Sequence, residues 1–241
     1  MSVTLIHYTT NRLPDGFAKK VREHLVGVAK KIDAHIISVS WKPMDFGENI
    51  VVGEKDGLTP NPSAYNVYRQ IFIGAQHAKT KNVACCEDDS LYNAEHFMVK
   101  APADKFLYNA NRWHVNRENF YYRKWVSMLA CVASTELMVK TLTERFARFP
   151  EPTPGWAFFV GKTKLHEPGK SEKKCGLAPV WLDWFETKTP VITFNHDMGL
   201  GQVRRPYKKA KGMYQDSLPY WGLAKDLWRE FFGPYKIGRR K

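Results

Sequence analysis

The fold is decided by VACCEDDSLY, residues 83–92, in which an apolar run ends in three consecutive acids. Residues 82–86 are short and mostly apolar, which predicts a buried strand. Glu87, Asp88 and Asp89 follow at once, and ligand sites in open α/β sheets lie at the carboxyl ends of strands. Three adjacent carboxylates repel one another, so a hard divalent cation would compensate them and could bridge to a diphosphate. The alternative is an acidic loop in which an Asp caps the following turn.

The segments before this stretch predict a parallel sheet flanked by helices. Strands and helices alternate, which is typical of an α/β fold with a Rossmann-like, mostly parallel central sheet. We expect strands at 3–8, 34–40 and 82–86, helices at 17–31 and 63–78, and a loop rich in Gly, Pro, Asn and Asp at 45–62.

The second half of the chain has a more aromatic character. Residues 105–132 are strand-like, and residues 151–178 have the composition of loops. We expect a helix at 135–146, a last strand at 191–195 that ends at His196, and an amphipathic helix at 220–232 with Leu223, Leu227, Trp228 and Phe231 on one face.

Length, charge and cysteine content bound the class of protein. A chain of 241 residues fits one large α/β domain, here residues 1–205, with a basic C-terminal extension at 206–241. The net charge is +13, and residues 203–241 alone hold eleven basic and three acidic residues, which predicts contact with a polyanion. Solubility is the simpler explanation of this charge.

Cysteine usage and the absence of targeting patterns in the sequence give an expectation for the cell compartment. The four cysteines form no C-x-x-C pair, and two of them lie in the apolar run 82–86, where thiols behave as small buried hydrophobes. We expect a reducing cytoplasm. The sequence shows neither a signal-peptide pattern nor an apolar run of the roughly 18 residues that a membrane span needs.

The acidic motif resembles the D-x-D-type motif of GT-A glycosyltransferases. The flanking residues 65–71, Leu91-Tyr92 and His96-Phe97 make the arrangement similar to glycosyltransferases found with DNA-modifying enzymes. That group includes phage DNA-base glycosyltransferases and the base-J glucosyltransferase of kinetoplastids. The resemblance runs from about Val3 to Arg205 and implies a GT-A fold, a UDP-sugar donor and Mn²⁺ or Mg²⁺. The motif departs from the family by starting with Glu where Asp is usual. This leaves open both the ribose contact and which of the acids meets the metal first.

The resemblance also implies roles for individual residues. Asp89 and His196 would bind the metal ion, and Gly199 and Gly201 would let the backbone approach phosphate. The donor would be contacted by Thr9, Thr10, Asn11, Arg12, Arg69, Glu87 and Asp88.

Each of these residues also has a simpler explanation. Residues 9–12 could be a turn that caps a helix. Arg69 could pair with a surface acid, and a lone histidine such as His196 is more often satisfied by the backbone than bound to a metal.

Proton transfer from an acceptor hydroxyl would need a carboxylate base in an inverting enzyme. Asp183 and Glu186 lie in Trp181-Leu182-Asp183-Trp184-Phe185-Glu186, and desolvation among aromatics would raise their basicity. A helix with two solvated acids and three core aromatics is the alternative, and a retaining enzyme would not need this base.

Basic and aromatic residues of the second half indicate a nucleic-acid acceptor. The resemblance implies that it is a hydroxymethylated pyrimidine in DNA, which we expect to be flipped out of the duplex. Phosphates would be contacted by Arg112, Arg117, Arg123, Arg204, Arg205, Lys208, Lys209, Lys211, Arg239, Arg240 and Lys241. Bases would stack on some of Tyr108, Trp113, Phe120, Tyr121, Tyr122 and Trp125, although many such aromatics belong to cores. A metal-dependent nuclease, a glycosyltransferase acting on a glycan or lipid, and a non-enzymatic DNA-binding module remain as rivals.

Overall fold

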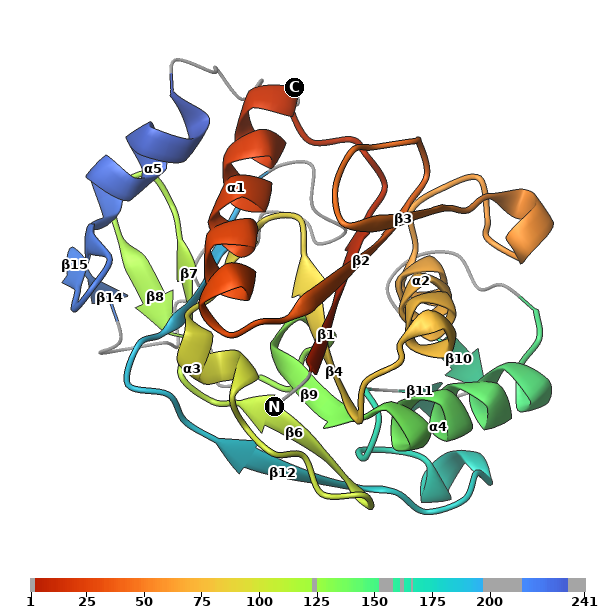
Figure 1. Ribbon diagram of the computed structural model, residues 1–241. Coiled ribbons are helices and arrows are strands. Elements are labelled where there is room, and N and C mark those ends of the chain that lie inside the picture. The colour runs from red at the N-terminus through yellow and green to blue at the C-terminus, as the bar shows by residue number, and fades with distance from the viewer. Residues whose placement is uncertain are drawn as a thin grey trace.

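The computed structural model describes residues 3–122, 125–151, 158–160, 163–165, 167–196 and 214–233. These residues form a mixed α/β structure around a seven-stranded sheet with helices on both faces (Figure 1). Among the described residues, no helix has the length and apolarity to cross a bilayer.

The first half of the chain alternates strands and helices, as expected. It contains β1 Val3–Thr9, α1 Asp15–Lys31, β2 His35–Ser40, β3 Glu48–Val51, η1 Glu54–Asp56, α2 Ala64–His77 and β4 Asn82–Glu87. The Ser63 side chain caps α2 by accepting from the Asn66 backbone N–H, which explains where this helix begins.

The expected loop at 45–62 is wrong in part, because it contains β3 and η1. β3 extends the sheet in parallel beside β2. The Asn49 side chain donates to Ser38 Oγ and Ser40 Oγ, at 2.8 Å each. These side-chain contacts, together with the ladder to β2, hold a short edge strand whose Gly- and Pro-rich flanks have the composition of a loop.

The second half supplies the remaining strands and two longer helices. They are β5 Ser90–Leu91, α3 Ala94–Phe97, β6 Lys105–Asn109, β7 Arg112–Val115, β8 Phe120–Tyr122, η2 Met128–Ala130, β9 Cys131–Ser134, α4 Thr135–Arg148, β10 Phe158–Val160, β11 Thr163–Leu165, η3 Lys173–Cys175, β12 Trp181–Phe185, β13 Val191–Phe194, β14 Tyr214–Gln215, β15 Ser217–Leu218, β16 Gly222–Leu223 and α5 Ala224–Phe232.

Two expectations at the C-terminal end are corrected. β13 is not the last strand, because β14 pairs with β8. The helix expected from residue 220 begins at Ala224, since Tyr220 has a φ of 73° and β16 turns back on β15. Leu227 and Phe231 are buried as expected, whereas Leu223 is 42% exposed.

The central sheet has the strand order β12-β6-β9-β4-β1-β2-β3. β9 runs antiparallel to both neighbours, and the other strand pairs are parallel. α2 and α4 pack on one face, and α1 packs on the other. Residues 83–86 are fully buried, which is why β4 has a nearly continuous apolar sequence. Both cysteines of this run are free thiols inside the core, as predicted.

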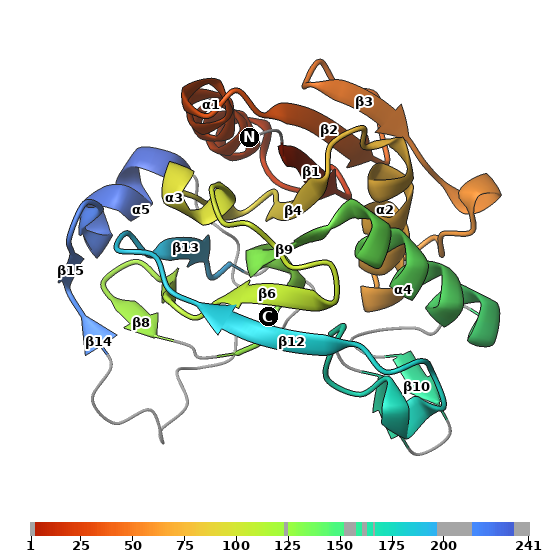
Figure 2. The ribbon, with the colours of Figure 1, turned by 60° about the horizontal axis from the view of Figure 1, so that its bottom comes forward.

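A second sheet has the order β14-β8-β7-β13-β5 and lies beside the first (Figure 2). Only two residues separate the end of β4 from the start of β5, so the acidic residues lie where the chain passes from one sheet to the other. This junction places the candidate site.

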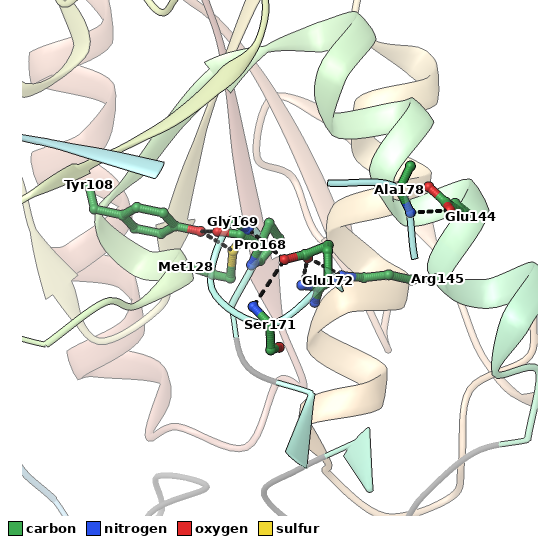
Figure 3. A network of polar contacts seen from close by, with 9 residues as sticks. All are labelled: Tyr108, Met128, Glu144, Arg145, Pro168, Gly169, Ser171, Glu172 and Ala178. Carbon is green, nitrogen blue, oxygen red and sulfur yellow. Dashed lines mark hydrogen bonds and ion pairs between the residues drawn. The ribbon is translucent and has the colours of Figure 1, made fainter. Parts of the chain in front are cut away.

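A buried ion pair anchors the segment that leads into β12 (Figure 3). Arg145 of α4 contacts Glu172 through Nε at 3.0 Å and also through Nη2. The other Glu172 oxygen accepts from the backbone N–H groups of Gly169 and Ser171. Tyr108 of β6 donates to the Pro168 carbonyl at 2.9 Å. These contacts fix residues 168–172 against α4 and β6.

Replacing Glu172 by Gln should destabilise the fold strongly, because the Arg145 charge would remain buried without its counter-charge. We expect a loss of about 3–5 kcal/mol in the free energy of unfolding, measured by urea denaturation. Glu23→Gln removes one partner of the exposed Lys19–Glu23 pair and should change little. Equal midpoints for both variants would contradict this role of Glu172.

Two buried histidines should make the fold sensitive to acid. Burial lowers the pKa of His7 from 6.5 to about 3, with a smaller effect of Arg22, and lowers the pKa of His96 to about 3. As pH falls from 6.5 to 3, the unfolded chain therefore binds protons that the folded chain does not. Stability is present above this window and is lost as pH falls through it.

His7→Leu should reduce this acid sensitivity. Each such histidine contributes a slope of about 1.4 kcal/mol per pH unit within the window, so the variant should show a shallower fall in stability between pH 6 and pH 4. Urea denaturation at several pH values measures it, with exposed His77→Gln as control. A slope unchanged by His7→Leu would refute the assignment.

Candidate functional site

The acidic residues lie beside the end of β1 at the carboxyl edge of the central sheet. The parallel register pairs Tyr8 with Glu87. Tyr8 donates its hydroxyl hydrogen to Glu87 Oε1 at 3.1 Å, and the Thr9 hydroxyl donates to Asp88. Neighbouring strand ends therefore hold two of the three carboxylates in fixed positions.

The third carboxylate meets His196. β5 and β13 pair antiparallel, with Ser90 opposite Thr193, and the Phe194 backbone N–H donates to the Asp89 carbonyl at 2.9 Å. This register brings His196 Nε2 to 3.2 Å from Asp89 Oδ2. The structure thus brings together two residues that are 107 positions apart in sequence.

The electrostatics of this edge are unfavourable for three negative charges. Burial, and then the charges of Asp89 and Asp88, raise the pKa of Glu87 to about 8. Burial and the Asp89 charge raise the pKa of Asp88 to about 7, against the opposing effects of the Thr9 hydrogen bond and His196. The chain's own groups compensate these carboxylates incompletely.

A divalent cation could bind at this edge if the protein side chains and a bound substrate shared its coordination. Within the described residues, no three His, Cys, Asp or Glu side chains form a complete metal site by themselves. Mg²⁺-type sites use one or two carboxylates and complete their shell with substrate phosphates and water. Asp89 could supply a carboxylate and His196 an imidazole nitrogen, a ligand that suits first-row transition metals.

The loop after β1 is held in shape by Asn11, which has a φ of 54°. Its side-chain oxygen accepts from the backbone N–H groups of Trp41 and Lys42, at 2.9 Å each. Thr10 is half-buried and Arg12 is exposed at this edge. Asn11 therefore joins the loops that follow β1 and β2.

Arg69 has structural contacts that the sequence did not indicate. Its Nε donates to the Asp56 carbonyl at 2.9 Å, and its guanidinium lies 4.9 Å from the centre of the Phe146 ring. Gln70, the next residue, reaches the strand ends and donates to the Thr9 and Val39 carbonyls. α2 thus contacts the site edge through Gln70, which the sequence analysis missed.

Asp183 and Glu186 do not have the desolvated environment that was expected. Both are exposed, and Asp183 lies on the edge strand β12 rather than on a helix. The Trp184 backbone N–H and then Lys105, 3.4 Å away, lower the pKa of Asp183. The prediction of raised basicity is therefore wrong for Asp183.

The sheet register also separates Asp183 from the acidic motif. Asp183 pairs with Leu107, which is level with Val132 and, through it, with Ala84 of β4. It therefore lies three strands along the sheet from β4, opposite a residue that precedes Glu87 by three positions. Figure 2 shows β12 at this outer edge.

The residues expected to contact nucleic acid differ in exposure, and most of them lie outside the described residues. Arg112 is 3% exposed, so the prediction that it contacts phosphate on the surface is wrong, whereas Arg117 is exposed in the turn between β7 and β8. The remaining predicted contacts, together with Gly199 and Gly201, lie outside the described residues; they are Arg123, Arg204, Arg205, Lys208, Lys209, Lys211, Arg239, Arg240 and Lys241.

Most of the expected stacking aromatics belong to the core. Tyr108, Phe120 and Tyr121 are buried, and Trp113 and Tyr122 are half-buried. The exception is Trp125, which is 50% exposed and has the Lys170 ammonium 5.1 Å from its ring centre. A continuous stacking platform is therefore absent from the described residues of this group.

Tyr92 is a further site residue that the sequence analysis did not assign. Its hydroxyl accepts from the Glu87 backbone N–H at 3.0 Å and donates to the Leu129 carbonyl at 2.9 Å. It fixes the backbone where β4 ends. Its spacing of five residues from Glu87 was visible in the sequence, but its inward direction was not.

Comparisons with known proteins give distant likenesses of fold. No protein-family model and no curated protein sequence matches this chain. The chain is similar to the catalytic domain of Drosophila β1,4-galactosyltransferase 7, with 12% identity and a TM-score of 0.42, over 78% of this chain and 65% of that one. It thus spans less than two thirds of that chain's length.

Two other solved structures are similar to a comparable degree. A glycosyltransferase involved in glycosylation of the major capsid of PBCV-1 shows 10% identity and a TM-score of 0.44, over 80% of this chain and 92% of that one. A nucleotidyl transferase from Methanothermobacter shows 12% identity and a TM-score of 0.40, over 78% and 88%. These likenesses concern the path of the chain alone.

Glu87→Gln should stabilise the metal-free protein at pH 9. The substitution removes one of three crowded charges and keeps an acceptor for the Tyr8 hydroxyl. We expect a higher melting temperature than that of the unsubstituted protein. Glu118→Gln, which alters an exposed glutamate, should leave the melting temperature unchanged. A lower melting temperature for Glu87→Gln would show that these charges are compensated by the fold alone.

Proposed function

We propose that this chain is a metal-dependent glycosyltransferase of the GT-A type that uses a UDP-sugar donor. The observation that carries the proposal is the pair Asp89–His196, 3.2 Å apart, beside Asp88 and Glu87 at the carboxyl edge of the central sheet. An anionic donor bound there would share a cation with this pair.

Asp89 and His196 would hold the metal ion. When bound, the ion would neutralise the negative charge on the leaving diphosphate. Thr9 and Tyr8 keep the carboxylates of Asp88 and Glu87 oriented for contact with ribose or sugar. The polar loop after β1, braced by Asn11, is the proposed position of the nucleotide.

We leave Asp183 and Glu186 out of the proposed site. Both are exposed, and the sheet register separates Asp183 from the acidic motif. Arg69 is left out as well, because its guanidinium holds the Asp56 carbonyl and packs on Phe146.

For the acceptor, we propose a hydroxymethylated pyrimidine base in DNA. The net charge of +13, concentrated in residues 203–241, supports a polyanionic partner. Exposed Arg117 adds one cation within the described residues. A glycan acceptor is the alternative, and a nuclease would use similar acids without any sugar donor.

A donor screen with Mn²⁺ tests the activity. UDP release is measured from a panel of UDP-sugars, with and without hydroxymethylated DNA. Asp89→Asn should lower the rate about 100-fold, equivalent to about 2.7 kcal/mol of transition-state stabilisation. The matched control is Asp104→Asn, an exposed aspartate just before β6, which should keep the rate.

Three results would contradict the proposal in different ways. Absence of UDP release with every donor removes the transferase. Release stimulated by glycans and not by DNA removes the DNA acceptor. Cleavage of plasmid by Mn²⁺ without any donor, abolished by Asp89→Asn, supports the nuclease instead.

A further inference from the structure

The C-terminal helix α5 inserts a stack of aromatic rings behind the candidate site. The Phe232 ring lies between Trp228 and Phe17, with ring centres 4.3 and 4.2 Å away and interplanar angles of 21° and 20°. Phe194, at the end of β13, meets the edge of this stack at 5.2 Å from Phe17. Phe17 belongs to α1, which lies beside α5 (Figure 1). The ring contacts therefore join α1, α5 and β13.

His196 rests against this stack. Its ring centre is 6.1 Å from both Phe17 and Phe232, with interplanar angles of 65° and 56°. The His196 side chain is only 2% exposed, and its Nε2 faces Asp89 at 3.2 Å. Because the Phe17 and Phe232 ring centres are only 4.2 Å apart, both rings lie on one side of the imidazole. Their packing, together with the Asp89 contact, restricts the rotamers that the imidazole can adopt.

Polar contacts outside the stack hold α5 in place. Lys20 of α1 donates to the Glu230 carbonyl of α5. The Ala224 backbone N–H donates to the Asp216 carbonyl at 2.9 Å, and Asn119 donates to the Asp216 side chain at 2.8 Å. α5 is thus fixed to α1 at one end and to the β7–β8 turn at the other.

We propose that α5 is a structural part of the metal site, with Phe232 and Phe17 as positioning residues for His196. This inference rests on the proposed function, because it takes His196 as a metal ligand. The rings set the direction of the imidazole and exclude water from its far side. Residues around metal ligands contribute about 10- to 100-fold to metal affinity in this way.

The test is the dissociation constant for Mn²⁺, measured from the electron paramagnetic resonance signal of free Mn²⁺ in the presence of UDP. Phe232→Leu should raise this constant about 10-fold or more while the protein stays folded by circular dichroism. Phe17→Leu removes the other ring and should have the same effect. Phe17→Leu also keeps the inference testable if Phe232→Leu does not fold.

Phe106→Leu is the matched control, because Phe106 is equally buried but belongs to the core cluster of α2, α4 and the central sheet. Phe17 and Phe232 belong to the separate cluster of α1, α5 and the second sheet. Phe106→Leu should lower the melting temperature to a similar degree and leave the Mn²⁺ constant unchanged. This contrast separates positioning from general stability.

The inference is overturned if folded Phe232→Leu and Phe17→Leu bind Mn²⁺ as tightly as the unsubstituted protein, or if Phe106→Leu weakens binding equally. Failure of the proposed function gives a different result. In that case the unsubstituted protein does not bind Mn²⁺, or Asp89→Asn binds it equally well.

Discussion

The crowding of three carboxylates at the end of the central strand is the constraint on which the rest of the site depends. Glu87 and Asp88 are held by hydroxyl groups from the neighbouring strand, and Asp89 is held against His196. These contacts orient the acids without neutralising them, since burial and mutual repulsion keep the pKa values of Glu87 and Asp88 high. A fold that keeps such a cluster has a place for a cation.

The junction of two sheets makes this cluster possible. β4 belongs to the parallel sheet, and β5 begins the second sheet directly after the acids. The antiparallel pairing of β5 with β13 then brings a residue from late in the chain to the same edge. α5 closes the far side through its aromatic stack with α1. Distant parts of the sequence thus meet at one strand end.

Local sequence patterns predicted the elements that depend on local physics. The apolar run of β4, the Ser63 cap of α2 and the periodicity of α1 predicted these three elements, whereas β3 and η1 were missed. Asp89 and His196 were paired through a resemblance, and the register explains their contact.

The wrong predictions concern residues whose surroundings are set by tertiary packing. Arg112 looked like a surface cation but is buried, and Asp183 looked enclosed by aromatics but lies on an edge strand. Alternation of aromatics and cations cannot tell which side of a strand faces the core.

In the proposed site, His196 and Asp89 bind one metal ion together. Pulsed electron paramagnetic resonance of Mn²⁺ bound with UDP, on protein labelled with ¹⁵N-histidine, detects the bond to His196. A coupling between Mn²⁺ and a ¹⁵N nucleus is expected, and it should disappear in His196→Gln. Bound Mn²⁺ with no ¹⁵N coupling, or a coupling that survives His196→Gln, would contradict this joint binding.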